Sequence, residues 1–252
     1  MTRILVTNDD GIFSEGIIRL AQELEQLGEV IVVAPSSEMS AASHSLTLIR
    51  PLRIIEVRPN WYRVDGTPTD CVVLALNQVL KDQPWPDLVV SGINRGANLG
   101  DNVTYSGTVA GALEGSIYGL PSIAISQVGR EKFNFEKAAK FACQIAHKVL
   151  TEGLPKGTLL NVNIPPGEIK GVKITPTGSK IAATSIVEGR DPRGMKYFWI
   201  GEDSVSWHEV PGVDFEAIHE GFISITPLRN DLTDHQALAK LRHWGDITPE
   251  FD

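Results

Sequence analysis

Two adjacent carboxylates, Asp9 and Asp10, come just after the first apolar run of the sequence. The run at residues 4–7 has the composition of a strand buried on both faces of a parallel sheet. Because ligands bind beyond the carboxyl ends of the strands in an open α/β sheet, we expect both carboxylates at the edge of a ligand-binding crevice. The alternative is an ordinary polar turn before a helix, since Asn, Asp and Gly are common turn residues.

Oxygen-bearing side chains recur after two further predicted strands. The strand at residues 30–34 leads into a hydroxyl-rich loop, in which Ser40 or a neighbour is a candidate ligand, or which is simply a flexible surface loop. The strand at residues 88–90 leads into a Gly-rich loop that carries Asn94. Carboxylate, hydroxyl and amide oxygens are ligands of hard divalent cations such as Mg, Mn or Ca. The pattern therefore predicts an all-oxygen metal site.

The Gly-rich loop also predicts a place for an anion. Its glycines recur every fourth residue and free the backbone for close approach to a ligand, while Asn98 adds an amide. A helix then begins near Ser106 and Thr108, where free N–H groups and hydroxyls can bind an anion. An ordinary Ser or Thr helix cap is the simpler alternative. A cation beside an anion cradle is suited to metal-assisted phosphate hydrolysis, which needs no Ser or Cys nucleophile.

The remaining composition narrows the classes of function. The 23 basic and 31 acidic residues give a net charge of −8, which argues against a general surface for long nucleic acid or an anionic membrane. The six histidines show no metal-ligand spacing, and only His44 lies in a candidate active-site loop, where a surface histidine is the simpler interpretation. With no signal peptide and no transmembrane-length apolar stretch, we expect a cytoplasmic protein.

The elements that would position these residues alternate between strand and helix. A strand, a helix at residues 17–27 and a second strand form a βαβ unit, which implies a parallel sheet, and no G-x-G-x-x-G follows the first strand. The other predicted elements are a hairpin at 53–57 and 61–64, a helix at 71–80 capped by Thr69 or Asp70, a helix through 117, strands at 123–126 and 159–164, a helix at 134–150, a short helix at 214–221 and a strand at 222–228.

The segment from about 173 to 210 has a different pattern. A turn signal at residues 189–194 precedes the aromatic run at residues 197–200, which predicts an extended hairpin with apolar side chains that one subunit does not cover. We therefore expect a subunit contact there. A C-terminal helix, capped by Thr233, is expected at about 233–245. The chain reads as a single domain over 1–252, with a core at about 1–170 and 212–230.

Several motifs together resemble the SurE survival-protein family. They are Asn8-Asp9-Asp10-Gly11, Ser40 in its loop, Gly66-Thr67-Pro68-Thr69-Asp70-Cys71, Ser91-Gly92-Ile93-Asn94, Gly96-Ala97-Asn98-Leu99-Gly100, Tyr105-Ser106-Gly107-Thr108, residues 221–228 and Asp231-Leu232-Thr233. The resemblance covers nearly the whole chain. Its main departure is at residues 178–188, where Ser179 to Ala183 is less basic and less aromatic than the family pattern.

The resemblance implies a fold, an activity and a site. The fold is a Rossmann-like parallel-sheet core, three-layer α/β/α, with an extended C-terminal hairpin arm and an exchanged C-terminal helix, in a homodimer or homotetramer. The activity is a phosphoric monoester hydrolase of the 5'-nucleotidase kind, which acts on nucleoside 5'- and 3'-monophosphates and, in some members, on short polyphosphate. Carried over by position, one divalent ion per subunit falls on Asp9, Asp10, Ser40 and Asn94, phosphate binding on Asn98, Ser106, Gly107 and Thr108, and catalysis on Asp9, Asp10, Asn98 and Ser106.

Two other functions fit parts of the pattern. A haloacid-dehalogenase-like phosphatase also places an aspartate nucleophile after its first strand, but it needs two aspartates separated by one residue, whereas Asp9 and Asp10 are adjacent. A non-catalytic nucleotide-binding regulatory oligomer would keep the fold and the cradle, yet two unpaired carboxylates facing an anion would weaken its binding. Within the hydrolase interpretation, both metal-bound water and Asp10 stay open as the nucleophile.

Overall fold

The computed structural model describes the chain except residues 130–132, 182–184, 202–205, 208–209 and 248–252. Its main sheet has nine strands in the order β3-β4-β2-β1-β5-β6-β7-β13-β8. The strands of this sheet are β1 (Arg3–Thr7), β2 (Glu29–Pro35), β3 (Ile54–Arg58), β4 (Trp61–Val64), β5 (Leu88–Arg95), β6 (Ser122–Gln127), β7 (Thr158–Ile164), β8 (Gly171–Ile174) and β13 (Phe222–Arg229).

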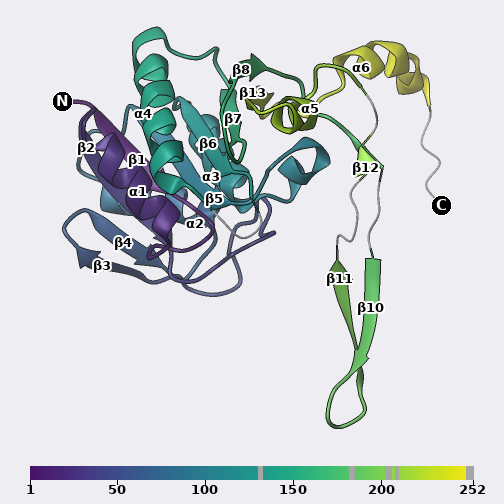
Figure 1. The fold of residues 1–252 in the computed structure, drawn as a ribbon, viewed down its shortest axis with the longest axis horizontal. Coiled ribbons are helices and arrows are strands. Elements are labelled where there is room, and N and C mark those ends of the chain that lie inside the picture. The colour runs from purple at the N-terminus through teal and green to yellow at the C-terminus, as the bar shows by residue number, and fades with distance from the viewer. Residues whose placement is uncertain (130–132, 182–184, 202–205, 208–209, 248–252) are drawn as a thin grey trace.

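Helices cover both faces of this sheet (Figure 1). They are α1 (Glu15–Leu24), α2 (Pro68–Leu74), α3 (Gly107–Ile117), α4 (Phe135–Glu152), α5 (Asp214–His219) and α6 (His235–Leu241). Helices α1 and α4 pack together on one face, and α2 and α3 pack together on the other. The predicted α/β fold with three layers is therefore confirmed.

The strand sequence explains this layering. Successive side chains of a strand point to opposite faces of the sheet, so Ile4 and Val6 of β1 join the core under α1 and α4, while Leu5 joins the core under α2. All three are completely buried. A strand that is covered on both faces needs a continuous apolar run, which is what residues 4–6 provide.

The topology places the carboxylate pair at a switch point of the sheet. Strand β1 pairs in parallel with β2 on one side and with β5 on the other. The chain goes first to β2 and later returns to β5, so the connections leave β1 in opposite directions. Ligand crevices in open α/β sheets form at such points, beyond the carboxyl ends of the strands. Asp9 and Asp10 follow the carboxyl end of β1.

Three local predictions are corrected by the structure. The N-cap of α2 is Thr67 rather than Thr69 or Asp70, because Asp70 instead occupies the third helical position and closes a capping box with Thr67. The predicted helix at 71–80 is split, since α2 ends at Leu74 and a π-helix follows at Ala75–Val79. The C-terminal helix α6 is capped by Asp234 rather than Thr233, and a 3-10 helix follows it at Arg242–Asp246.

The C-terminal part differs from the expected division in one further respect. Strand β8 lies within the main sheet, parallel to β13, although its last two residues belong to the segment expected to be extended. The extended segment itself contains a hairpin of β10 (Ser185–Arg190) and β11 (Lys196–Gly201), which projects away from the body (Figure 1). A short pair of β9 (Lys180–Ile181) and β12 (Ser206–Trp207) leads into it. Ala182 and Ala183, part of the departure noted above, lie outside the described residues.

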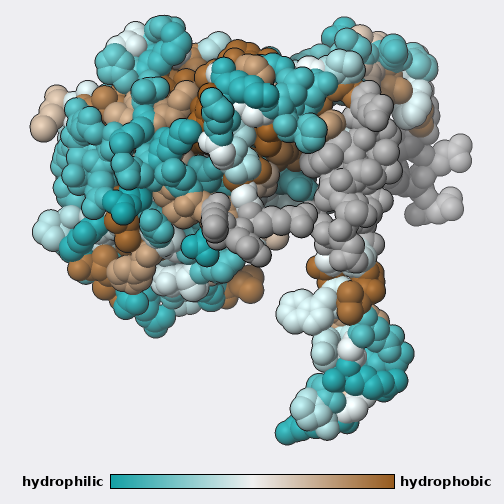
Figure 2. Space-filling view, in the orientation of Figure 1, coloured by the Kyte–Doolittle hydropathy of each residue, from teal (hydrophilic) through white to brown (hydrophobic). Residues whose placement is uncertain are grey.

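The hairpin of β10 and β11 exposes several large apolar side chains. Figure 2 shows hydrophobic side chains gathered on the part of the hairpin nearest the body. The exposed fractions of Phe198, Trp199 and Ile200 are 57%, 68% and 77%.

Among the described residues, no helix is long and apolar enough to cross a membrane.

Candidate functional site

Asp9 lies buried between the end of β1 and the start of α3. Its exposed fraction is 5%, and the hydroxyl Oγ1 of Thr108 donates a hydrogen bond to its Oδ1 over 2.5 Å. Gly107 allows this approach, because a Cβ at that position would lie 2.8 Å from the Cβ of Asp9 and 3.0 Å from its Oδ2. The first turn of α3 is therefore in direct contact with the carboxylate.

Both carboxylates are harder to ionise than usual. Burial, followed by the charge of Asp10, raises the pKa of Asp9 to about 6, and the Thr108 hydroxyl only partly offsets this. Burial also raises the pKa of Asp10, against the lowering effect of the Arg95 backbone N–H, which donates to its Oδ2 over 3.0 Å. A cation bound beside the carboxylates of Asp9 and Asp10 would stabilise the charged form of both.

Ser40 lies in the loop that passes over Asp9. The backbone N–H of Met39 donates to the carbonyl of Asp9 over 2.8 Å, which fixes this part of the loop beside the carboxylates. Ser40 itself is exposed, and its Oγ donates to Glu38 Oε1 over 2.6 Å. Asp10 and Ser40 line one cavity of about 450 Å³. Cavities of this size accommodate small-molecule ligands.

Asn94 lies on the neighbouring strand β5, close to the end of β1. The register pairs Thr7 with Ser91, so Asn94 extends beyond the end of β1. Its Nδ2 donates to the carbonyl of Gly96 over 3.1 Å, and its side chain is partly exposed. The four predicted metal ligands thus come from the turn after β1, from β5 and from the loop after β2.

Asn98 is held by residues that the sequence analysis did not single out. Its backbone N–H donates to Asn163 Oδ1 over 2.9 Å, and its carbonyl accepts from Asn161 Nδ2 over 2.8 Å and from Asn163 Nδ2 over 2.9 Å. Its own Nδ2 donates to Ser126 Oγ over 2.8 Å. Asn161, Asn163 and Ser126 are fully buried. Two asparagines at alternate positions of an otherwise apolar strand were the signal that could have identified them.

Ser106 caps the helix that opens the predicted anion cradle. Its Oγ accepts a hydrogen bond from the backbone N–H of Val109 over 3.0 Å. Ser106 is therefore an ordinary helix cap, the simpler of the two roles considered from the sequence. Capping uses one acceptor position, so the hydroxyl proton can still be donated to a ligand. The backbone N–H groups of Gly107 and Thr108 belong to the first turn of α3, whose N–H groups have no partner within the helix. The two roles are therefore compatible.

The residues of this site fit a hard divalent cation. The donor set consists of carboxylate, hydroxyl and amide oxygens, which suit Mg, Mn or Ca. Burial is the main cause of the raised pKa values of Asp9 and Asp10, and a bound cation would favour the charged form of both. In the part of the chain that the structure describes, no group of three or more His, Cys, Asp or Glu side chains is placed to hold a metal ion, so a cation here would rely on hydroxyl and amide oxygens besides the two carboxylates.

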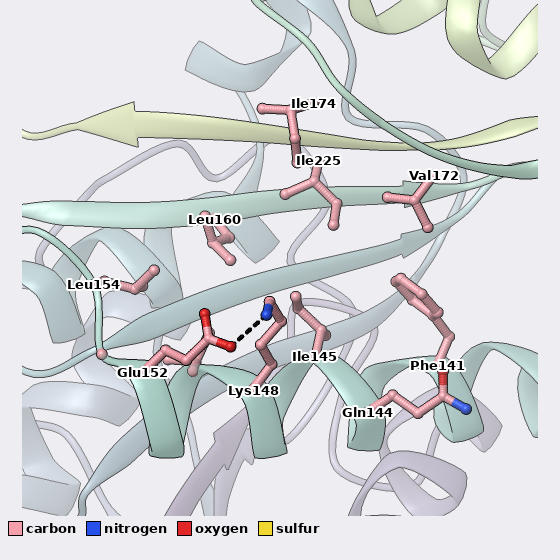
Figure 3. Close-up of a pocket in the computed structure, with 12 residues that line it drawn as sticks. Phe141, Gln144, Ile145, Lys148, Glu152, Leu154, Leu160, Val172, Ile174 and Ile225 are labelled. Carbon is pink, nitrogen blue, oxygen red and sulfur yellow. Dashed lines mark hydrogen bonds and ion pairs between the residues drawn. The ribbon is translucent and has the colours of Figure 1, made fainter.

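A second cavity lies elsewhere in the fold and offers no comparable chemistry. It has a volume of about 430 Å³ and lies between α4 and strands β7, β8 and β13 (Figure 3). Its lining is mostly apolar, with Phe141, Ile145 and Ile225 among the side chains that face it. The charged residues Lys148 and Glu152 at its rim pair with each other. The carboxylate site is therefore the better candidate for catalysis.

Comparison with known proteins agrees with the motifs. The family model described as "Survival protein SurE" matches residues 4–184. A protein named 5'-nucleotidase SurE from Syntrophotalea carbinolica is 49% identical over 96% of this chain and 97% of its own length. One of the same name from Aquifex aeolicus is 45% identical over 98% and 99%. The crystal structure of the Aquifex aeolicus SurE protein superposes with a TM-score of 0.86 at 45% identity, over 97% of this chain and all of that one.

Proposed function

The chain belongs to the SurE family of survival proteins, and from that premise we propose that it is a divalent-metal-dependent nucleotidase. Its substrates would be nucleoside 5'- and 3'-monophosphates, hydrolysed to nucleoside and phosphate, and short polyphosphate. The observation that carries this proposal is the adjacent carboxylates after β1, of which Asp9 is buried against the first turn of α3 and Asp10 is partly buried beside β5. The relatives named 5'-nucleotidase SurE support the reaction class.

The proposed roles follow from the donor chemistry of each side chain. Asp9, Asp10, Ser40 and Asn94 would hold one Mg, Mn or Ca ion per subunit, which when bound would neutralise phosphate charge and act as a Lewis acid. Thr108 keeps the Asp9 carboxylate oriented through its hydroxyl.

The phosphate would bind beside Asp9 and Asp10, at the start of α3. The amide of Asn98, the hydroxyl of Ser106 and the backbone N–H groups of Gly107 and Thr108 would donate to its oxygens as negative charge develops there. Asn161 and Asn163 fix the backbone of Asn98 from the buried side. The binding groups are thereby held in place before the substrate arrives, which lowers the cost of binding it.

Assembly and location are part of the same proposal. We infer a homo-oligomer, because the hairpin exposes large apolar side chains that contact with another subunit would cover. A dimer or tetramer in the cytoplasm, without long nucleic acid or membrane as partner, is the working model.

The first experiment measures phosphate release from a panel of 5'- and 3'-nucleoside monophosphates and short polyphosphate, with Mg, Mn or EDTA. Release should require metal. Asp9→Asn and Asp10→Asn should each reduce the rate by at least about 100-fold, as expected when a group that stabilises the transition state is lost. Asp82→Asn, an exposed position, is the control.

Two outcomes would contradict the proposal. Near-normal rates in both site variants would remove the metal site. No release from folded protein under any metal would favour the regulatory oligomer, which isothermal titration would detect as binding of nucleoside monophosphate without metal.

A further inference from the structure

The loop that carries Ser40 is attached to both halves of the site. We define the Ser40 loop as residues 36–47. At one end, Met39 donates its backbone N–H to the carbonyl of Asp9. Further along, the backbone N–H of Ser43 donates to the carbonyl of Tyr105 over 3.0 Å, and its Oγ donates to the carbonyl of Thr104 over 2.8 Å. The Ser40 loop therefore spans from the carboxylates to the turn that precedes Ser106.

The backbone of the loop adopts unfavourable conformations beside Ser40. Ala41 and Ser43 have φ angles of 56° and 53°, in the left-handed region that side chains with a Cβ rarely adopt. Such residues persist where the surrounding structure holds them in place. The contacts of Ser43 attach the loop only to backbone carbonyls, and two buried carboxylates attach its later residues.

Glu114 provides one such attachment. It lies on α3, about two turns after Ser106, and only 6% of its surface is exposed. Its Oε2 is 2.7 Å from Nε2 of His44. A buried carboxylate is costly without a partner, and His44 supplies that partner from the Ser40 loop. The contact connects the loop to the helix whose first turn forms the anion cradle.

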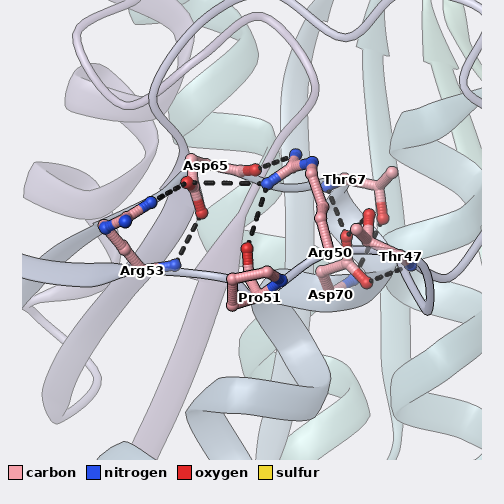
Figure 4. Close-up of polar contacts among 7 residues, drawn as sticks. All are labelled: Thr47, Arg50, Pro51, Arg53, Asp65, Thr67 and Asp70. Atoms are coloured by element: carbon pink, nitrogen blue, oxygen red, sulfur yellow. Dashed lines mark hydrogen bonds and ion pairs between the residues drawn. The ribbon is translucent and has the colours of Figure 1, made fainter.

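Asp70 provides a second attachment at the end of the loop (Figure 4). It is 2% exposed, and its Oδ1 accepts from the backbone N–H of Thr47 over 2.9 Å. Its Oδ2 accepts from Thr47 Oγ1 over 2.6 Å and from the backbone N–H of Thr67 over 2.9 Å. The nearby contacts of Asp65 with Arg50 and Arg53 are exposed to solvent, so they add little.

We propose that Glu114 and Asp70 are positioning residues, which hold the Ser40 loop over Asp9 through His44 and Thr47. This proposal rests on the proposed function, because it assigns the loop a role at the same metal site. Neither residue is among the proposed ligands of the metal or of the phosphate. Both act from helices, α3 and α2, so the position of Ser40 depends on the packing of two elements remote from it in sequence.

The test measures binding of Mn²⁺ alone, by electron paramagnetic resonance, so it does not depend on turnover. His44→Ala removes the contact with Glu114, and Thr47→Val removes the hydroxyl hydrogen bond to Asp70 while the backbone N–H of residue 47 stays. Each should weaken Mn²⁺ binding roughly tenfold, as when groups that orient metal ligands are lost. Thr47→Ser retains the hydroxyl and should bind like the wild type. Leu48→Ala, which truncates a side chain that is 85% exposed, should also leave binding unchanged.

The outcomes separate this proposal from the proposed function. If the wild type binds no Mn²⁺, the metal site itself is wrong. If the wild type binds and both His44→Ala and Thr47→Val stay within about twofold of it, the positioning role is overturned. His44→Ala leaves Glu114 unpaired and can therefore disturb folding. If His44→Ala does not melt cooperatively, the double variant His44→Leu, Glu114→Met is measured instead, because removing both partners is nearly neutral for folding.

Discussion

Burying the charged carboxylate of Asp9 costs free energy, and a bound cation would offset that cost. Its carboxylate is 5% exposed, next to a second carboxylate, and accepts one hydroxyl hydrogen bond. In the metal-free protein the charged form is therefore disfavoured, as the pKa of about 6 indicates. The geometry that prepares the site for metal also makes the empty site a weak point of the fold.

This cost predicts a pH dependence of stability. Folding raises the pKa of Asp9 from 3.8 to about 6, so the folded state binds this proton more tightly than the unfolded state does. The resulting contribution to the free energy of unfolding is fully present below about pH 4 and is lost as the pH rises through 6. At 1.36 kcal/mol per pKa unit, the loss is about 3 kcal/mol. In EDTA, Asp9→Asn should therefore gain stability relative to the wild type by about this amount between pH 4 and pH 7.5. Urea unfolding at four pH values measures it.

The same series contains its own control. Added Mn²⁺ at pH 7.5 should stabilise the wild type and not Asp9→Asn, because only the wild type keeps both carboxylates. A difference between the two proteins that does not change with pH would contradict the assigned cause of the pKa shift.

Residues next to an element boundary were identifiable from the sequence, whereas their remote partners were not. Asp9, Asp10 and Ser106 directly follow a strand or precede a helix, so local patterns mark them. Asn163 supports Asn98 from 65 positions away, and Glu114 pairs with His44 across 70 positions. Such pairs depend on which strands and helices become neighbours, and a single sequence does not give that information.

At the scale of elements, the Gly-rich loop is fastened to α5 by one carboxylate. Asp214 is fully buried, and its Oδ2 accepts from the backbone N–H of Gly100 over 2.8 Å. Its Oδ1 accepts from the N–H groups of Gly178 and Phe215 over 2.8 and 2.9 Å. The segment that carries Asn98 is thereby connected to the C-terminal part of the chain.

Replacing this carboxylate should destabilise the fold. Asp214→Asn puts an NH2 group where an acceptor is needed and leaves at least one buried N–H without a partner, which costs about 1–3 kcal/mol. We expect a lower melting temperature and faster hydrogen exchange at Gly100. The exposed Asp82→Asn serves as control. An unchanged melting temperature of Asp214→Asn would show that these hydrogen bonds contribute nothing net.

Most elements were predictable, but their ends were not. The strand at residues 4–7 and the helix at 134–150 agree closely with β1 and α4, because a continuous apolar run and a long amphipathic pattern mark them. The start of α2 was misplaced because both Thr67 and Thr69 are good caps. Thr67 is the cap because Asp70 lies three residues later and completes the capping box.

At the scale of the whole molecule, the hairpin of β10 and β11 exposes a group of large apolar side chains. Phe198, Trp199 and Ile200 are exposed on β11, in a two-stranded ribbon that projects away from the body (Figure 1). An isolated two-stranded hairpin is marginally stable in water. Contact with a second subunit would both cover these side chains and stabilise the ribbon.

Deleting residues 185–205 tests this role. The deletion should lower the molar mass measured by light scattering, while the main sheet, which contains neither β10 nor β11, should keep its melting transition. A milder control replaces Trp199 and Ile200 with Ser and Thr and should weaken assembly in the same direction. An unchanged mass in the deletion variant would refute a role of the hairpin in assembly.

The position of β13 between β7 and β8 has a consequence for synthesis of the chain on the ribosome. Among the described strands of the main sheet, β8 is hydrogen-bonded to β13 alone, and β13 begins roughly 50 residues later in the chain. At about 5–20 residues per second, β8 emerges several seconds before its partner strand. During that interval β7 is the open edge of the nascent sheet, and an open edge can pair with another chain. This part of the sheet is therefore open to mispairing until β13 has been synthesised.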